Sequence, residues 1–180
     1  LVVEGTRSLA VEVQALATAS SLASPRRVAN GVEMSRVHLI CAVLAKHMRL
    51  PVSNHDLVIS VTGGLDIKEP AADLAIALAI ASSMMDRPVM DTVAVAGEIG
   101  LSGELRSIPR ADRRALEAGR LGFSVCMIPD AAGDVGKLGS VPGSVKVVRP
   151  TNIAEAVRFA LEPVDGAVGS GSAAGARSSR

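Results

Sequence analysis

The stretch GGLDIKEPAADLAIALAIASS at residues 63–83 has the layout of a site that could do chemistry. A glycine pair follows an apolar strand pattern, and a charged turn then leads through Glu69 and Pro70 into a helical pattern. Helix N-termini placed in this way commonly hold a nucleophile or an anion, because their free N–H groups and the helix dipole favour negative charge. Here the first side chains are those of Ala71 and Ala72, so the expected reactive group is missing.

Other reactive groupings are weak in this chain. Gly63 and Gly64 could approach a phosphate, but a glycine pair after a strand is more typical of a turn. The sequence contains no GxxxxGK(S/T) motif and hence no P-loop, and no GxSxG elbow supports a Ser–His–Asp triad. His38, His47 and His55 lack the spacing of metal ligands. We therefore predict no metal site.

Arginines gather in the segment RSIPRADRRALEAGR at residues 106–120. Helical spacing places three of them on one face: Arg110, Arg113 and Arg114. One interpretation is a solvated face on which arginines pair with Glu117. The other is a ridge that contacts phosphates, together with three further arginines: Arg26, Arg27 and Arg36. The sequence alone leaves both interpretations open.

Composition narrows the class of protein. The net charge is +1, so no global field draws the chain onto polyanions. Phe123 and Phe159 are the only aromatic residues, which argues against stacking on nucleic-acid bases. Cys41 and Cys126 lie in apolar runs and are expected to be buried and reduced. We find no signal peptide and no membrane-spanning run, and we expect a cytoplasmic protein without a membrane partner.

Periodicity predicts a mixed order of strands and helices. Strand patterns occupy residues 8–18, 56–64, 92–108 (two strands joined by a tight LSG connection), 123–129 and 144–150. Helical patterns occupy residues 35–48, 70–86, 111–122 and 151–162, the last capped by Asn152 or Thr151. The order indicates an α/β (α+β) fold with a mixed sheet. Residues 163–180 are rich in Gly, Ser and Ala and are expected to be a disordered tail.

The order of these pieces resembles the proteolytic domain of Lon-type ATP-dependent proteases. The resemblance rests on EPAADLAIALAIASS, VAVAGEIGLSGELRSI, the arginine-rich helix and GFSVCMIP. Within that lineage, VEVQAL, PRR, EPAADLA, GEIGLSGELR and EAGRLGF are similar to the C-terminal Lon-like domain of the RadA (Sms) family of bacterial DNA-repair ATPases. The resemblance implies a mixed sheet of the ribosomal protein S5 domain 2-like type at residues 8–162, after a junction at residues 1–7.

The Lon family uses a Ser–Lys dyad, and the resemblance places both positions in this chain. The serine position falls on Ala71 and the lysine position on Asp112, so neither catalytic group is present. Losing the serine of a serine protease lowers kcat by a factor on the order of 10⁶. Ser82 and Ser83 lie about three helical turns further along and cannot substitute. The resemblance therefore implies a domain that is not an enzyme.

The glycine turn, the helix start and the hairpin segment are expected to have structural roles. Glu69 and Asp73 are expected to hydrogen-bond around the helix start or to reach an arginine, Arg106 or Arg110. The resemblance assigns structural roles to the glycine turn, the helix start and the hairpin block: Gly63, Gly64, Glu69, Pro70, Asp73, Gly97, Glu98, Gly103 and Glu104.

The resemblance also implies a longer parent protein, and the chain begins at Leu1 rather than Met, so we expect a fragment. The parent would be a DNA-dependent ATPase with a zinc finger and a RecA-like core, working in branch migration. We expect no cofactor in this fragment, and ATP, Mg²⁺ and Zn²⁺ in the rest of the parent. Expected partners are further copies in a hexameric ring, DNA, the ATPase domain, and recombinase or replication proteins.

Two functions of different classes follow. The first is a non-catalytic scaffold that assembles into a ring and offers arginines to DNA. The second is a peptidase or peptide-binding module that keeps the substrate groove of the Lon type with altered catalytic groups. A purely structural domain that regulates a neighbouring ATPase is a third possibility, which the sequence cannot separate from the first.

Overall fold

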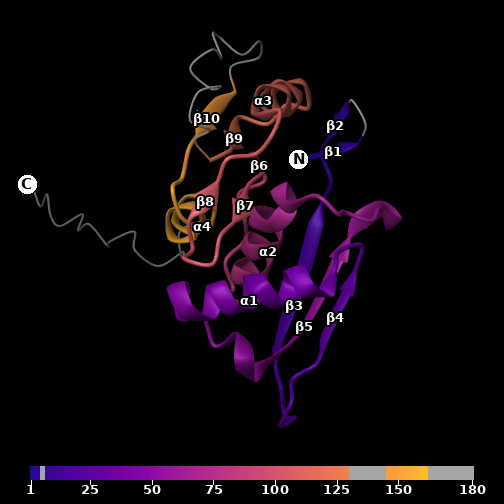
Figure 1. The fold of residues 1–180 in the computed structure, drawn as a ribbon, viewed down its shortest axis with the longest axis vertical. Helices are drawn as coiled ribbons and strands as arrows, with labels where there is room; N and C mark the ends of the chain where they lie inside the picture. Colours follow the sequence, from indigo (N-terminus) through magenta and orange to yellow (C-terminus); the bar gives the residue numbers. More distant parts are fainter. Residues whose placement is uncertain (5–6, 130–144, 162–180) are drawn as a thin grey trace, which may run out of the picture.

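The computed structural model describes residues 1–4, 7–129 and 145–161. Figure 1 shows a molecule elongated along one axis, with a sheet and its helices in the lower half and a second, smaller α/β unit in the upper half. The predicted tail at residues 163–180 lies outside the described residues. No helix within the described part of the chain is both long enough and apolar enough to cross a bilayer.

The lower half is built on a three-stranded sheet. Its strands lie in the order β3 (Val13–Ala19), β5 (His55–Val61) and β4 (Arg27–Asn30), with β3 antiparallel and β4 parallel to β5. Leu57 and Ile59 of β5 are fully buried in a core shared with helix α1 (Met34–Met48). The other face of the sheet is open, because Leu16 on β3 and Val58 on β5 are exposed and lie opposite each other.

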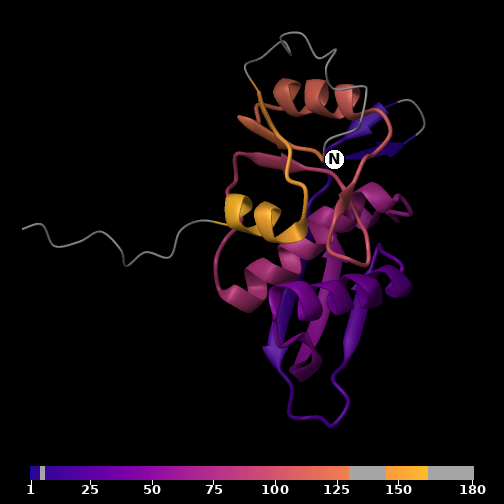
Figure 2. The ribbon, with the colours of Figure 1, turned by 60° about the vertical axis from the view of Figure 1, so that its left-hand side comes forward.

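The upper half carries a parallel sheet. Its strands lie in the order β10 (Lys146–Val148), β9 (Val125–Met127) and β6 (Val93–Val95). Helix α3 (Ala111–Arg120) lies over this sheet (Figure 2). Its alanines Ala111, Ala115 and Ala118 share a buried cluster with Cys126 of β9. Two hairpins complete the described strands: β1 (Val2–Glu4) with β2 (Arg7–Leu9), and β7 (Glu98–Ile99) with β8 (Leu105–Arg106).

Helix α2 (Asp73–Met85) connects the two halves. It is apolar on nearly all sides, as predicted, and its buried residues include Leu74, Ile80 and Ala81. It packs against β3, α1 and helix α4 (Ile153–Ala160). A short 3-10 turn at Pro70–Ala72 precedes it, because proline suits the first turn of a helix. The segment that the sequence marked as chemically promising is therefore central to the fold.

The mixed α/β class is confirmed, and the four predicted helices are found to within a few residues in the described chain. The Asn152 side chain caps α4 by accepting a hydrogen bond from the Glu155 N–H at 2.9 Å. The single strand predicted at residues 8–18 is wrong. Leu9 pairs with Val2 in one hairpin, whereas Val13 pairs with Val61 in the larger sheet, so the chain changes sheets between them.

Candidate functional site

The start of α2 is reached through a glycine turn and an extended segment. The turn at Thr62–Gly64 follows β5, and Gly63 and Gly64 have φ values of +79° and +68°. Residues with a side chain rarely adopt this left-handed backbone conformation, so the turn itself needs glycine. Both glycines are exposed. The following segment is fixed by the Ile67 N–H, which donates to the Gly31 carbonyl at 2.8 Å.

Ala71, the position implied for the nucleophile, is closed off by packing. Its exposed fraction is 2%, and it belongs to the same buried cluster as Ala111, Ala115 and Ile128. The backbone is also engaged, because the Ala71 carbonyl accepts a hydrogen bond from the Gly97 N–H at 2.8 Å. The methyl group therefore fills a core position, and no solvent reaches it.

Asp112, the position implied for the lysine, lies outside the buried face of α3. It is exposed, whereas its neighbour Ala111 is buried in the cluster that contains Ala71. The buried face of α3 repeats through Ala111, Ala115 and Ala118, which is the spacing of one helix face. The structure thus brings Ala71 together with the alanine face of α3 and leaves Asp112 in solvent.

A buried ion pair locks α3 to the segment before α2. Arg114 has no exposed surface, and its guanidinium pairs with the Glu69 carboxylate. The same guanidinium donates to the Leu1 carbonyl at 2.6 Å and to the Pro109 carbonyl at 3.2 Å. The other Glu69 oxygen accepts from the Val3 N–H at 2.7 Å. Burial lowers the pKa of Arg114 to about 10, which still leaves it protonated at neutral pH.

A second ion pair locks α1 to the first turn of α2. Asp73 is 1% exposed and pairs with the Arg36 guanidinium, whose Nε lies 3.1 Å from Oδ1. Asp73 Oδ2 also accepts a hydrogen bond from the Ile99 N–H at 3.2 Å. Burial raises the pKa of Asp73, and the hydrogen bonds from Arg36 and Ile99 oppose that shift. Asp73 therefore joins α1, α2 and β7 at one point.

The predicted arginine partners of these two carboxylates are wrong. Arg106 pairs instead with Glu104, two residues earlier, at 2.9 Å, and lies 3.7 Å from Glu98, its partner across the β7–β8 hairpin. Arg110 caps the start of α3 with a left-handed backbone at φ +58°. The arginines that reach Glu69 and Asp73 are Arg114 and Arg36.

The six arginines predicted to contact DNA do not form one surface. Arg114 is buried and Arg36 is ion-paired, so both serve the interior, which corrects the expectation of a shared exposed face for Arg110, Arg113 and Arg114. Arg27 is half-buried and donates to the Val52 carbonyl at 3.4 Å. Arg26 and Arg113 are exposed. Figures 1 and 2 place α3 and the β3–β4 connection at opposite ends of the molecule.

The hairpin block GEIGLSGEL forms a compact support beneath α4. A Cβ at Gly100 would meet Glu104 Oε1 at 1.8 Å, so a side chain there would displace the Glu104 carboxylate. Gly103 has φ +79°, and its carbonyl accepts a hydrogen bond from the Ile153 N–H at 2.9 Å. The Glu104 carboxylate holds the turn by accepting from the Ser102 N–H at 3.0 Å. Gly97 lies between α2 and Pro129, with a Cβ position 2.9 Å from that ring.

Other candidate reactive groups are also committed to structure. Ser82 Oγ donates to the Arg87 carbonyl at 2.6 Å, and Ser83 Oγ accepts from the Ala17 N–H at 2.9 Å. Cys41 and Cys126 are buried thiols without a disulfide, as predicted, and burial raises the pKa of Cys126 to about 12. Among the described residues, no three His, Cys, Asp or Glu side chains form a group that could hold a metal ion.

Sequence reasoning missed the role of Arg114, although a signal was present. Ala111, Arg114, Ala115 and Ala118 follow the i, i+3, i+4, i+7 spacing of a single helix face. An arginine in the middle of an alanine stripe is expected to be buried and to need an acidic partner. The partnership of Arg36 with Asp73 had no comparable signal, because it joins two helices that are distant in sequence.

Sequence comparison relates this chain to known proteins. A family model described as Subunit ChlI of Mg-chelatase matches residues 9–132. The chain is 42% identical over 158 residues to DNA repair protein RadA of Bacillus subtilis, covering 88% of this chain and 34% of that protein. It is 45% identical over 128 residues to DNA repair protein RadA of Salmonella typhimurium, covering 71% of this chain and 28% of that protein. The chain thus spans about a third of the length of these curated relatives.

Proposed function

The chain belongs to the family described as Subunit ChlI of Mg-chelatase and is homologous to the DNA repair proteins RadA, and from this premise we propose that it is a non-catalytic scaffold of a RadA-type DNA repair protein. In this proposal the domain has the Lon proteolytic fold without its chemistry. It holds subunits together in a hexameric ring and presents arginines to DNA.

One observation carries the proposal: the helix start that would hold a nucleophile is filled by a buried methyl and secured by two ion pairs. Ala71 has neither a hydroxyl nor solvent contact. The carboxylates that flank it in the sequence, Glu69 and Asp73, are paired with Arg114 and Arg36. Acyl transfer needs a nucleophile next to a base, with both accessible to substrate. The packed helix start offers rigidity, which suits a scaffold.

The DNA role rests on exposed arginines that lie far apart in one subunit. Arg26 and Arg113 are exposed at opposite ends, so a single subunit cannot present them as one ridge. In an assembled ring, equivalent arginines repeat around the axis and can follow a phosphate backbone. Such contacts are independent of base sequence and weaken as salt rises, because they release condensed counterions.

Fluorescence anisotropy of labelled DNA tests this role in the assembled protein. We expect affinity to fall at least tenfold between about 50 mM and about 200 mM salt. The Arg26→Ala and Arg113→Ala double variant should bind more weakly than the wild type. Arg158→Ala, on the exposed side of α4, is the matched control and should change little. Absence of DNA binding at either salt concentration would remove the DNA role, and a monomer in light scattering would remove the ring.

Digestion of unfolded casein tests the non-catalytic assignment. We expect no cleavage by the wild type. The Ala71→Ser and Asp112→Lys double variant should also remain inactive, because position 71 is buried and position 112 is exposed outside the buried face of α3. Cleavage by the wild type would favour the peptidase alternative. Cleavage by the double variant alone would show that the two positions meet in solution.

The activities of the whole protein are part of the same proposal. In a RadA-type protein, the two thirds of the length outside this match would bind ATP, Mg²⁺ and Zn²⁺ and drive branch migration in the cytoplasm. The present domain would contact that ATPase region and, through it, recombinase or replication proteins.

A further inference from the structure

A groove runs along the half-exposed side of α2. It consists of two adjoining hollows of about 610 and 540 Å³ that share Val13, Ala79 and Val89 among their lining residues. The floor is made of small α2 side chains, Ala75, Ala79 and Ser82. Ala71 does not line either hollow, so the groove is separate from the packed start of α2.

One wall of the groove is the open edge of β3. In the β3–β5 ladder, the Thr62 N–H donates to the Glu12 carbonyl and the Ser20 N–H to the Asn54 carbonyl, so even-numbered residues of this strand bond toward β5. The N–H and carbonyl groups of odd-numbered residues point away from β5, and the Ala17 N–H accordingly donates to Ser83 Oγ. The N–H and carbonyl groups of Val13 and Ala15 therefore face the groove, and they have no partner among the described residues.

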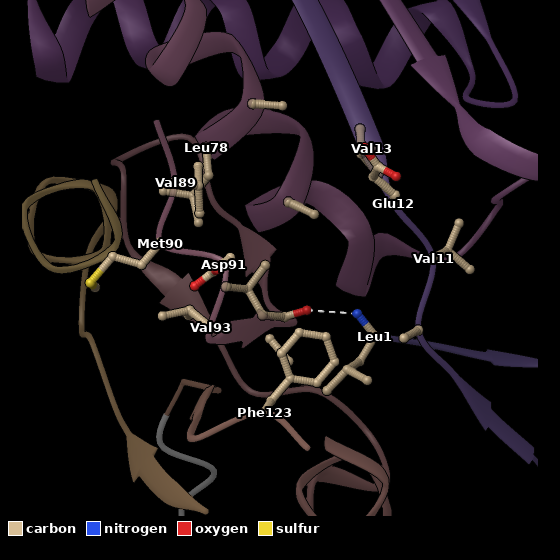
Figure 3. Close-up of a pocket in the computed structure, with 15 residues that line it drawn as sticks. Leu1, Val11, Glu12, Val13, Leu78, Val89, Met90, Asp91, Val93 and Phe123 are labelled. Carbon is tan, nitrogen blue, oxygen red and sulfur yellow. Dashed lines mark hydrogen bonds between the residues drawn. The ribbon is translucent and has the colours of Figure 1, made fainter. Parts of the chain in front are cut away.

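The opposite wall is the segment that leads into β6. Figure 3 shows Val89, Met90 and Val93 across the hollow from β3. β6 is itself an edge strand, and its Val95 carbonyl accepts a hydrogen bond from the Leu1 nitrogen at 2.8 Å (Figure 3). Two strand edges thus border one apolar channel. An unpaired strand edge is a ready template for a further strand.

The charge around the groove has one sign on the side chains. Glu12 and Asp91 line the larger hollow and are exposed. Among the described residues, no Lys, Arg or His side chain lines either hollow. A segment that carries basic side chains would therefore meet complementary charge here, and an acidic one would be repelled.

We propose that this groove binds an extended segment of a partner protein, which adds to the open edge of β3 as a further strand. Main-chain hydrogen bonds to Val13 and Ala15 would supply affinity, as in other cases of strand addition. Alternate side chains of the segment point to one face, so small or β-branched apolar residues would rest on Ala75 and Ala79. A lysine or arginine of the segment would pair with Glu12 or Asp91. This binding is independent of the DNA role.

A defined peptide tests the proposal. The probe is a fluorescein-labelled heptapeptide, Lys-Val-Thr-Val-Thr-Val-Lys, with blocked ends, titrated with the intact protein. We expect the same peptide with glutamate at both ends to bind at least about tenfold more weakly, because its charges oppose those of the rim. Replacing the central valine by proline should weaken binding about tenfold, because proline cannot donate to a ladder. No binding of the lysine peptide up to millimolar concentration, or no effect of proline, would overturn the proposal.

Variants of the groove keep the test specific. Ala79→Phe fills the floor and should reduce lysine-peptide binding at least tenfold. Its matched control is Ala45→Phe, on the exposed surface of α1, which should bind as the wild type does. If Ala79→Phe fails to fold, the double variant Glu12→Lys and Asp91→Lys replaces it, because both positions are exposed. That variant should prefer the glutamate peptide, and an unchanged preference would overturn the proposal.

Amide hydrogen exchange separates this occupant from a second copy of the chain. Peptide binding should slow exchange at Val13 and Ala15. It should leave Gln14 and Leu16 unchanged, because these amides already bond toward β5. Protection of Val13 and Ala15 in the peptide-free protein that disappears on dilution would assign the groove to a contact between copies and overturn the proposal.

Discussion

Helix α2 borders two regions that differ in how completely they are satisfied. At its start, the Ala71 methyl is buried, and both nearby carboxylates are bound by arginines from α1 and α3. Along its half-exposed side, alanines form the floor of a groove, and the N–H and carbonyl groups of Val13 and Ala15 in β3 face it without partners among the described residues. The first region has the sequence layout of an active site and is closed. The second has no sequence motif and is open.

The difference separates a packed part of the interior from a surface that is open to a ligand. Buried charges persist in a fold when they are paired and hydrogen-bonded, as Arg114 and Asp73 are. Unpaired strand edges persist when something else limits their pairing or when they serve to bind. The start of α2 therefore holds neighbouring elements together, and the groove is the place where this surface can bind a ligand. Four measurements can break or sharpen this contrast.

The largest effect is expected at the buried pair of the closed region. Arg114→Met keeps the aliphatic stem but leaves Glu69 without its cation, and it should lower the free energy of unfolding by about 3–5 kcal/mol. Arg113→Met, one position earlier and exposed, should change it by no more than about 0.5 kcal/mol. Urea unfolding of both variants measures the difference. Equal effects would mean that the Arg114–Glu69 pair does not hold the start of α2 in place.

A second variant shows whether the pair stabilises or only has to be matched. Replacing both partners, Arg114→Met together with Glu69→Leu, should recover most of the lost stability, because an apolar pair needs no desolvated charge. Failure to recover would indicate that the hydrogen bonds to the Leu1 and Pro109 carbonyls carry the loss.

The predictability of the two regions follows the range of their interactions. Helices at residues 35–48 and 70–86 were visible because apolar spacing is a local signal. The absence of a nucleophile at Ala71 was also visible, since it depends on one residue type. The partners of Glu69 and Asp73 were not, because they come from helices 45 and 37 residues away in sequence. The groove was invisible because it arises where β3 and β6 are both left as edges.

The next effect compares one substitution in both regions. Ala71→Ser places a hydroxyl in a packed alanine cluster and should cost about 1–3 kcal/mol of unfolding free energy. Ala79→Ser adds the same hydroxyl beside the groove, where water can bind it. Its cost should be about 0.5 kcal/mol, the helix-propensity difference. Chemical denaturation distinguishes the two. A cost at position 71 no greater than at position 79 would show that the start of α2 can accommodate a serine hydroxyl.

The smallest effect is a pH dependence at Asp73. Burial raises its pKa in the folded protein above the ordinary value of 3.8, so the folded state holds this proton more tightly than the unfolded state does. The stability gained from that proton is fully present below pH 3.8 and is lost as pH rises through the folded pKa. Asp73→Asn removes this titration, so the difference in unfolding free energy between variant and wild type should shift in favour of the variant as pH rises from 3.5 to 6.5. The shift should be modest, because Arg36 and the Ile99 N–H offset much of the burial cost. A shift in the opposite direction would mean that the ion pair with Arg36 outweighs burial, and that the closed region is held by attraction between charges more than by packing around them.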